Sequence, residues 1–523
     1  MSLLLIHPPA AKPAEPPLGL AVLQAHLRAA GAEVRVFDAN LDAYLDHLHP
    51  ARLAAATGLT PEPRLRRALR HAAAALALLR SPAAMSRPAR YVTAVNHLND
   101  ALGAYRGASG EERLTLGDYR HQRLSEFTPE HLELLATGRE RTLFHDYYVR
   151  QVLPRVLAWR PQRIGLSINY RHQVLPAFEL AGLLRRQLPE VELIAGGGMI
   201  GSWLPALQGG LRLPPFDRLV AGAGEEPLGR LSQGQAGTEV LLRGAGGANF
   251  RPDFAGLEPA PYLSPLPVLP VTATRGCYWA RCLFCPEAGA PAHAYRPMPG
   301  SALPKMLRQL ADRWQVRHFH LTDNAIPLPA LRALAGSPDL MADLAWYGFV
   351  RFEPQLLSGA LLPGLARAGC RLLQLGLESG SQAVLDRLGK GTRVEIAAEV
   401  LRRARQAGIA TYVYVLLGTP GESLDELQQT RDFLQRHADH IDFLNLAIMN
   451  LPRHSSLADA AAGSDAALEP LGLYRPVTED ARERRSARRF LQQELLGDPS
   501  IRAIVRRTPP LFTSNHAFFF PPR

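Results

Sequence analysis

Lysine is scarce in this chain of 523 residues. It occurs only at Lys12, Lys305 and Lys390, so arginine supplies nearly all of the positive charge behind a net charge of +11. We interpret most of this charge as a solvated arginine-rich surface. The sharper alternative is attraction to an anionic ligand. No basic tract is interleaved with aromatic residues, which argues against a nucleic-acid partner.

Long apolar segments and secretion signals are also missing. No apolar run approaches the roughly 20 residues that a membrane-spanning helix needs. The N-terminus lacks the basic stretch and the cleavage site of a signal peptide. Together with a content of only four cysteines, these absences predict a cytoplasmic protein without a membrane span. At this length we expect two or three domains.

Three of the four cysteines lie in one short stretch, Arg275–Pro286, at Cys277, Cys282 and Cys285. Three thiols cannot all pair as disulfides, and a reducing compartment would keep them free. Structural zinc usually takes four protein ligands and no histidine lies in this stretch, so zinc is the lesser alternative. A [4Fe–4S] cluster held by three cysteines leaves one iron open for a further ligand. The stretch therefore predicts such a cluster.

The N-terminal part, residues 1–235, has the pattern of a Rossmann-like domain. Apolar runs typical of buried parallel strands alternate with helical patterns and lie at 2–6, 33–37, 163–168, 191–195 and 218–220. Residues 41–158, rich in Ala, Leu and Arg, are expected to form a helical insertion. Residues 236–270, rich in Gly and Pro, are interpreted as an interdomain linker.

Residues 271–450 repeat a strand–helix pattern six times. The expected strands are 271–274, 318–321, 346–352, 372–377, 412–417 and 443–448. This predicts a partial (βα)6 barrel, in which ligands bind at the carboxyl ends of the strands. Residues 451–523 are expected to be a C-terminal extension with a charged helix at 479–496 and an aromatic end at 512–520. The fold class is therefore α/β, with a Rossmann-like domain followed by a barrel.

The cysteine stretch, with its lead-in Arg-Gly-Cys-Tyr-Trp, resembles the cluster loop of radical S-adenosylmethionine (SAM) enzymes, and in particular of those that bind cobalamin. The usual spacing in that family is Cys-x3-Cys-x2-Cys, whereas this chain has Cys-x4-Cys-x2-Cys. Gly376–Ser381 (Gly-Leu-Glu-Ser-Gly-Ser) and Gly418–Glu422 (Gly-Thr-Pro-Gly-Glu) resemble further motifs of the family, in the family's order. The resemblance implies a [4Fe–4S] cluster and SAM as cofactors.

The same resemblance implies roles for residues at the ends of the barrel strands. Phe284 is expected to contact the adenine of SAM, Glu378 its ribose and Ser379 its carboxylate. Asp323 stands where the family often binds the amino group. The residues expected beside the adenine in the fifth-strand turn are Gly418, Pro420 and Gly421. The alternative for the serines is capping of the next helix.

Arg351, Asn450 and His454 are the candidate substrate contacts. Arg351 could pair bidentately with a carboxylate, and the alternative is a structural ion pair with Glu353. Asn450 and His454 follow the last strand, where each could instead order its loop. Cys370 is expected to be structural, which leaves no ligands for a second cluster. The sequence identifies no catalytic residue.

The N-terminal domain resembles cobalamin-binding domains in part. Ser167 and Asn169 stand where those domains carry Ser-x-Leu, and Gly196 and Gly197 stand where they carry Gly-Gly. Glycines at this point let a nucleotide tail approach the backbone. The family's histidine motif after the first strand is absent, because that strand ends His-Pro-Pro. Cobalamin is therefore implied, and a domain that binds nothing is the alternative.

These features together predict a cobalamin-dependent radical SAM enzyme that cleaves SAM reductively and methylates an unactivated carbon. The expected partners are a small-molecule or peptide substrate and an external electron donor such as flavodoxin or ferredoxin. One alternative keeps both cofactors but forms or rearranges a ring without methylation. Another is a non-catalytic protein that binds cobalamin or senses redox state.

Overall fold

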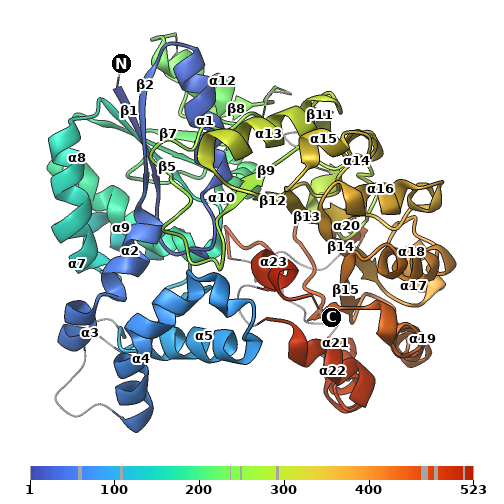
Figure 1. Ribbon diagram of the computed structural model, residues 1–523. Helices are drawn as coiled ribbons and strands as arrows, with labels where there is room; N and C mark the ends of the chain where they lie inside the picture. Colours follow the sequence, from blue (N-terminus) through green and yellow to red (C-terminus); the bar gives the residue numbers. More distant parts are fainter. Residues whose placement is uncertain are drawn as a thin grey trace. The chain divides into compact units, whose positions relative to one another are not determined.

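The computed structural model describes residues 2–56, 62–106, 110–235, 237–247, 250–289, 294–460, 469–475, 481–509 and 513–521 (Figure 1). The chain divides into two compact units. The first contains Met1–Gly247, Arg251–Pro267 and Glu469–Gly472, and the second contains Ala248–Phe250, Val268–Leu468 and Leu473–Arg523. Each unit contains one six-stranded parallel sheet.

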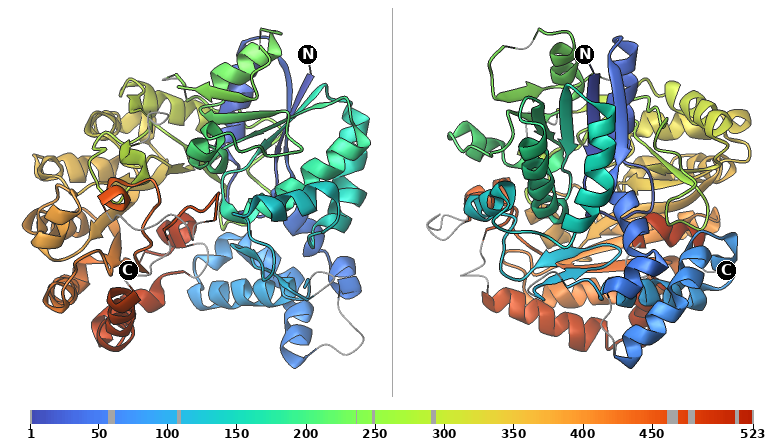
Figure 2. Two further views of the ribbon diagram at one scale, coloured as in Figure 1. Left: turned by 180° about the vertical axis from the view of Figure 1, so that it is seen from behind. Right: turned by 90° about the vertical axis from the view of Figure 1, so that its left-hand side faces the viewer.

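The sheet of the first unit has the strand order β2-β1-β5-β6-β7-β8. Its strands are β1 (Ser2–His7), β2 (Glu33–Asp38), β5 (Arg163–Ser167), β6 (Glu192–Gly196), β7 (Arg218–Gly222) and β8 (Leu241–Gly244). In β1, the run Leu-Leu-Leu-Ile-His is buried throughout, as is typical of a parallel strand covered on both faces. Figure 2 shows helices on both faces of this sheet.

The helices of the first unit alternate with its strands and also form the insertion. They are α1 (Leu18–Ala29), α2 (Ala39–His47), α3 (Pro50–Ala56), α4 (Pro63–Leu79), α5 (Pro88–Leu102), α6 (Pro129–Thr137), α7 (His145–Tyr147), α8 (Leu153–Trp159), α9 (Arg171–Gln187), α10 (Gly198–Ser202), α11 (Leu204–Gln208) and α12 (Glu225–Ser232), with a 3-10 turn, η1 (Pro82–Ala84), and a π turn, η2 (Tyr148–Val152). The insertion is not wholly helical, because β3 (Glu112–Leu114) and β4 (Tyr119–His121) form an antiparallel pair.

The expected linker over 236–270 differs most from the structure. Four residues of this stretch, Leu241–Gly244, form β8, which pairs in parallel with β7. A strand this short shows no recognisable periodicity in the sequence. The segment 251–267 belongs to the first unit, where the Tyr262 hydroxyl donates to Asp38 at 2.7 Å and the Leu263 amide donates to the Pro13 carbonyl at 2.8 Å. These contacts make the segment part of a domain.

The sheet of the second unit has the order β16-β15-β14-β13-β12-β9. Its strands are β9 (Val268–Val271), β12 (His318–Leu321), β13 (Ala345–Val350), β14 (Cys370–Glu378), β15 (Ala410–Leu417) and β16 (Phe443–Ile448); β10 (Thr274–Arg275) and β11 (Arg296–Pro297) form a separate pair. An open parallel sheet of six strands in this order is the expected partial barrel, and the α/β prediction is confirmed.

The helices between these strands lie along one side of the sheet (Figure 1). They are α13 (Ala302–Trp314), α14 (Leu328–Ala335), α15 (Pro338–Met341), α16 (Leu361–Arg367), α17 (Gln382–Arg387), α18 (Val394–Gln406) and α19 (Leu424–Arg436). In α18 the buried residues Ala397, Val400, Leu401 and Ala404 recur at the spacing of one helix face. Helix α19 begins with a reciprocal capping box between Ser423 and Glu426.

The C-terminal extension contains α20 (Ser456–Ala460), α21 (Ala481–Phe490), a π turn, η8 (Leu491–Leu495), α22 (Pro499–Arg507), α23 (Thr513–His516) and η9 (Ala517–Phe519). Its aromatic end packs on the barrel sheet. Phe518 stacks on Tyr347 with ring centroids 4.4 Å apart, and the Tyr347 hydroxyl donates to the Asn515 carbonyl at 3.1 Å. Phe512, in the same predicted aromatic stretch, lies outside the described residues.

No helix in the described part of the chain has both the length and the apolar character that crossing a bilayer requires.

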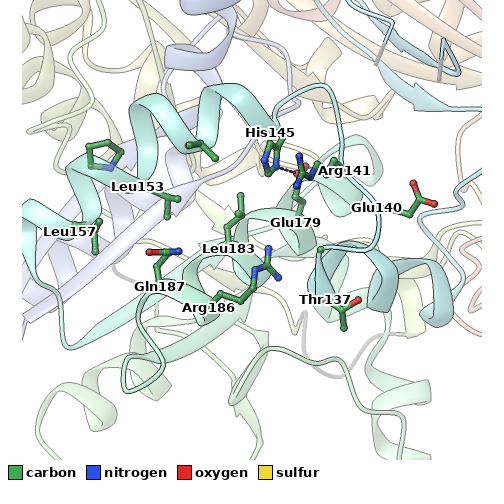
Figure 3. Close-up of a pocket in the computed structure, with 13 residues that line it drawn as sticks. Thr137, Glu140, Arg141, His145, Leu153, Leu157, Glu179, Leu183, Arg186 and Gln187 are labelled. Atoms are coloured by element: carbon green, nitrogen blue, oxygen red, sulfur yellow. Dashed lines mark hydrogen bonds and ion pairs between the residues drawn. The ribbon is translucent and has the colours of Figure 1, made fainter. Parts of the chain in front are cut away.

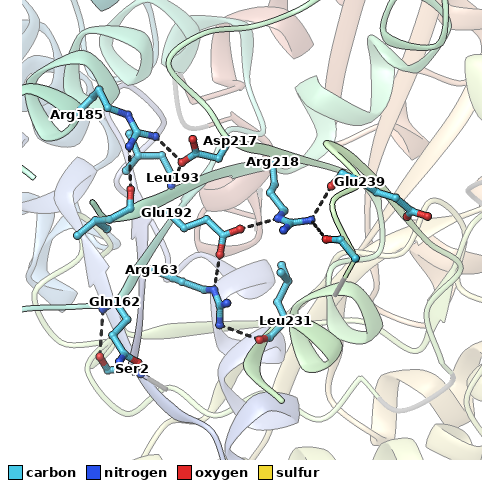
Figure 4. Close-up of polar contacts among 12 residues, drawn as sticks. Ser2, Gln162, Arg163, Arg185, Glu192, Leu193, Asp217, Arg218, Leu231 and Glu239 are labelled. Carbon is cyan, nitrogen blue, oxygen red and sulfur yellow. Dashed lines mark hydrogen bonds and ion pairs between the residues drawn. The ribbon is translucent and has the colours of Figure 1, made fainter. Parts of the chain in front are cut away.

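The first residues of β5, β6 and β7 form a charged network (Figure 4). Glu192 accepts from Nε of Arg163 at 2.5 Å and from Nε of Arg218 at 2.6 Å. Burial raises the pKa of Glu192, but the hydrogen bonds from the two arginines outweigh that effect, so its net pKa is lowered. The network lies at the amino ends of the strands, opposite the edge where open parallel sheets bind ligands.

We predict that Glu192→Gln destabilises the first unit by roughly 1–2 kcal/mol at pH 7, since charged hydrogen bonds weaken but partial exposure screens them. A carboxylate with a lowered pKa stabilises the fold above its unfolded pKa of about 4.5 and loses this effect as the pH falls through the folded pKa. The deficit should therefore shrink below about pH 4. Urea unfolding at several pH values measures it, with exposed Glu190→Gln as control; equal curves would contradict the prediction.

Candidate active site

The cysteine loop, residues 276–286, follows β10 in the second unit. Cys277, Cys282 and Cys285 are all free thiols, and the Cys285 amide donates to the Cys282 carbonyl at 3.1 Å. Between the first two cysteines, Ala280 has φ of +45°, in the left-handed region that non-glycine residues seldom occupy. Among the described residues, no three His, Cys, Asp or Glu side chains converge into a metal-binding group as they stand.

The turn at Leu388–Thr392, which we call the Lys390 turn, packs against this loop. The Leu283 amide donates to the Leu388 carbonyl at 2.9 Å, and the Trp279 indole donates to the Gly389 carbonyl at 3.0 Å. A Cβ on Gly391, whose φ is +67°, would lie 2.0 Å from the Trp279 ring. Glycine is therefore needed for the loop and the turn to lie this close.

Arg351, which follows β13, contacts the cysteine loop. Its Nη1 lies 3.9 Å from Sγ of Cys282, and its guanidinium lies 4.3 Å from the centre of the Trp279 ring. Its Nε lies 3.4 Å from Glu353, which gives the ion pair considered as the alternative. A cavity of about 10 Å³ beside Arg351 and Glu353 has room for about one water molecule.

Glu378 ends β14 and folds back over its own strand. Its φ is +63°, and its Oε1 accepts from Nζ of Lys390 at 2.7 Å. A Cβ on Gly376 would lie 2.5 Å from this oxygen, so the glycine makes room for the ion pair. Among the described residues, no other donor reaches the Glu378 carboxylate.

Asp323 and Ser379 are deeply buried and order their own segments. Asp323 accepts from the Thr274 hydroxyl at 2.7 Å and from the Ala273 amide at 3.1 Å. Burial raises the pKa of Asp323, and these hydrogen bonds oppose the rise. The Ser379 hydroxyl is fully buried, bonds to the Thr430 hydroxyl at 2.9 Å and accepts from the Ser381 amide. Direct contact of either with SAM stays a proposal.

The turn after β15 is held by its own glutamate. Oε2 of Glu422 accepts from the amides of Gly418 at 2.7 Å and Thr419 at 3.0 Å. Gly418 and Gly421 have φ of +71° and +72°, which glycine adopts without strain. Burial raises the pKa of Glu422 to about 6, against the two backbone amides that lower it. Phe284 packs beside this strand against the apolar cluster that contains Met449 and Leu451.

Of the predicted substrate contacts, Arg351 lies beside the cysteine loop, 3.9 Å from Sγ of Cys282. Asn450 accepts from Arg484 at 2.7 Å through its side-chain oxygen, which fits the loop-ordering alternative. His454 is exposed. Cys370 is 1% exposed, with its thiol 4.0 Å from the Leu372 carbonyl, which fits the expected structural role. Sequence reasoning missed Lys390, although a rare lysine between two glycines was a visible signal.

The predicted cobalamin residues meet at the carboxyl ends of β5 and β6 in the first unit. Asn169 donates through Nδ2 to the Ser167 hydroxyl oxygen at 3.0 Å, and its Oδ1 accepts from the Gly198 amide at 3.1 Å. A Cβ on Gly197 would lie 2.5 Å from the Ile168 carbonyl oxygen, whereas one on Gly196 would make ordinary contact with Val220. Gly197 is thus required by the packing of the two loops themselves.

A separate cavity of about 480 Å³ lies in the first unit, lined by residues of α6, α7, η2, α8 and α9 and of the segment between α6 and α7 (Figure 3). His145 and Glu179 pair at 2.7 Å on its wall, and Glu179 also accepts from the Thr142 amide at 2.9 Å. None of the residues predicted for cofactors or substrate lines this cavity.

Comparison with known proteins accounts for the cysteine loop and the barrel. Residues 271–434 match the model of the radical SAM superfamily. The second unit contains a radical SAM domain. The fold is similar to that of OxsB, solved with aqua-cobalamin and SAM bound. The match covers 95% of this chain and 67% of the OxsB chain, with a TM-score of 0.61 at 15% identity. It is also similar to that of TsrM from Kitasatospora setae, solved with tryptophan and a SAM analogue. This match covers 96% of this chain and 89% of the TsrM chain, with a TM-score of 0.54 at 15% identity.

A curated relative of this chain is 4'-phospho-dehydrooxetanocin synthase of Priestia megaterium, 25% identical over 339 residues. The match covers 55% of this chain but only 44% of the relative's length. The resemblance to cobalamin-binding radical SAM enzymes is confirmed at the level of the domain and the fold.

We predict that Gly391→Ala loosens the cysteine loop, because the added methyl group would overlap Trp279. Trypsin should then cleave after the exposed Arg281 about tenfold faster, the change expected if local opening becomes easier by about 1.4 kcal/mol. Quantitative mass spectrometry of the released peptide measures the rate. Gly408→Ala is the matched control, since Gly408 has φ of +74° but no atom within 4 Å of its added Cβ. Equal rates in both variants would contradict the steric explanation.

Proposed function

We propose that this protein is a cobalamin-dependent radical SAM enzyme that methylates an unactivated carbon of its substrate. The observation that carries this proposal is the edge of the radical SAM domain. The loop with the three free thiols comes after β9 and the short β10, Glu378 ends β14, and the turn at Gly418–Glu422 follows β15, so that β9, β14 and β15 of one parallel sheet all lead to this edge. Ligands of such sheets bind at the carboxyl ends of the strands.

Cys277, Cys282 and Cys285 would hold a [4Fe–4S] cluster. Their chemistry fits, because all three are reduced thiols on one short loop, and the loop offers no fourth cysteine or histidine, which leaves one iron open. Cys370 is buried away from solvent in β14 and is not needed as a ligand. When bound, the cluster supplies the electron with which SAM is cleaved.

The chain's own residues would bind SAM and exclude water from it. The Glu378 carboxylate can accept hydrogen bonds from the two ribose hydroxyls, because only Lys390 reaches it among the described residues. The turn at Gly418–Gly421 is fixed by Glu422 and can present its backbone to the adenine. Phe284 would supply an apolar surface beside it.

Ser167, Asn169, Gly196 and Gly197 would hold the nucleotide tail of cobalamin in the first unit. The Gly196 position fits, since an added Cβ would make only ordinary contact with Val220, so the protein's own packing does not require glycine there, whereas close approach of a nucleotide tail would. Asn169 holds the Ser167 hydroxyl and the Gly198 amide in a fixed arrangement. These residues position the cofactor, and the cofactor carries the methyl group.

Methylation is favoured by the similarity to TsrM, which is described as a radical SAM methyltransferase. The second candidate, ring formation or rearrangement without methylation, is favoured by the similarity to a protein named as a synthase. In either reaction, an external one-electron donor such as flavodoxin or ferredoxin would supply the cluster. Arg351, Asn450 and His454 remain candidate contacts of an unidentified small-molecule or peptide substrate.

Protein purified without oxygen should contain about four irons and four sulfides per chain, and one corrinoid. Cys282→Ala should lose the iron but keep the corrinoid, whereas the control Cys370→Ala should keep both, because Cys370 is a packing residue. Iron and sulfide assays and the visible spectrum measure this. Zinc in place of iron would overturn the proposed function, and iron without corrinoid would remove methylcobalamin from it.

Glu378→Gln should weaken SAM binding to the cluster-loaded protein about tenfold, because a charged acceptor of the ribose hydroxyls is lost. Equilibrium dialysis with radiolabelled SAM measures the Kd. Glu395→Gln, at a side chain 71% exposed on α18, is the control. An unchanged Kd for Glu378→Gln would remove this residue from the SAM site.

A further inference from the structure

Arg351 carries a charge that the assigned roles leave unexplained. Its side chain is only 6% exposed and carries a guanidinium charge. Burying a guanidinium costs free energy unless hydrogen bonds and an opposite charge compensate for it. The carboxylate of Glu353 lies at 3.4 Å from Nε and also accepts from the Tyr278 hydroxyl at 2.8 Å.

The remaining contacts of Arg351 all point to the cysteine loop and its support. Nη2 donates to the Lys390 carbonyl, Nη1 lies within hydrogen-bonding reach of Sγ of Cys282, and the guanidinium plane covers the Trp279 ring. A planar group with five donors can make these contacts at once, and a lysine cannot. One side chain therefore joins the loop, the Lys390 turn and the end of β13.

A second buried cation belongs to the same arrangement. Lys390 is 7% exposed and pairs with Glu378 at 2.7 Å. Its backbone is fixed by the two glycines that bring the turn against the loop. Cys282 thus lies beside Arg351, which also donates to the backbone of Lys390. In this buried environment, charges are weakly screened.

We propose that Arg351 is a positioning residue that fixes the Cys282 side of the loop and makes the cluster held there easier to reduce. The proposal rests on the proposed function, because it assumes that the loop binds a [4Fe–4S] cluster. One electron passes from an external reductant to the cluster, and no bond forms or breaks. A buried positive charge and a hydrogen bond to a cysteine sulfur both stabilise the reduced form, whose net charge is more negative.

The test uses the full chain, loaded with iron and sulfide without oxygen, and the variants Arg351→Gln and Arg351→Lys. EPR-monitored titration with dithionite gives the midpoint potential. Arg351→Gln should shift the reduction equilibrium at least tenfold toward the oxidised form, which corresponds to about 59 mV for a one-electron couple. Arg351→Lys keeps the charge and should recover part of this shift. The control Arg405→Gln removes an arginine paired with Asp442 and should leave the potential unchanged.

The positioning role has its own readout, which needs no cluster. In the chain before loading, trypsin should cleave after Arg281 faster in Arg351→Gln and in Arg351→Lys than in the wild type or in Arg405→Gln. This measurement still decides the positioning role if Arg351→Gln takes up no iron.

Unchanged cleavage in both Arg351 variants would overturn the positioning role, and an unchanged midpoint potential in a loaded Arg351→Gln would overturn the electrostatic role. If the wild type takes up no iron, the proposed function fails, and the cleavage rates still report on Arg351. If the wild type takes up iron and the variants match it in both measurements, only this inference fails.

Discussion

The contact between the cysteine loop and the Lys390 turn is the constraint on which the edge of the radical SAM domain depends. Two glycines make the close approach possible, because a side chain on Gly389 would meet the Arg281 carbonyl of the loop and one on Gly391 would meet the Trp279 ring. The turn follows α17, which in turn follows Glu378 at the end of β14. The position of the thiols is therefore fixed by the strand that also carries the carboxylate proposed to bind SAM.

Buried charge at this edge is used mainly to order the backbone. Asp323 holds the segment that leads into the cysteine loop, and Glu422 holds the turn after β15. Amides and hydroxyls donate to both carboxylates and offset part of the cost of burying them. Glu378 differs from them, because its partner is a lysine side chain and its carboxylate keeps acceptor capacity for a ligand. This acceptor capacity supports the proposal that Glu378 binds SAM.

The sequence was informative where periodicity and motif order coincide. Strands β12 and β16 begin and end at the predicted residues, because short segments with apolar residues that alternate with helical patterns mark the strands of a parallel sheet. Strand β8 was missed because four residues carry too little pattern. The sequence also could not show that Ser379 bonds to Thr430, since this hydrogen bond joins residues 51 positions apart that only the fold brings together.

Lysine usage bears on the Arg351 arrangement. This chain uses arginine for almost all of its cations, yet it has lysine at position 390, between two glycines. A guanidinium there would be bulkier and would make a forked contact with Glu378, whereas an ammonium is a compact point charge that leaves much of the carboxylate free. Arg351 has the opposite task, because it must contact a sulfur, a ring and a carbonyl at once. Lysine at position 390 and arginine at position 351 thus each suit the contacts that they make beside the cysteine loop.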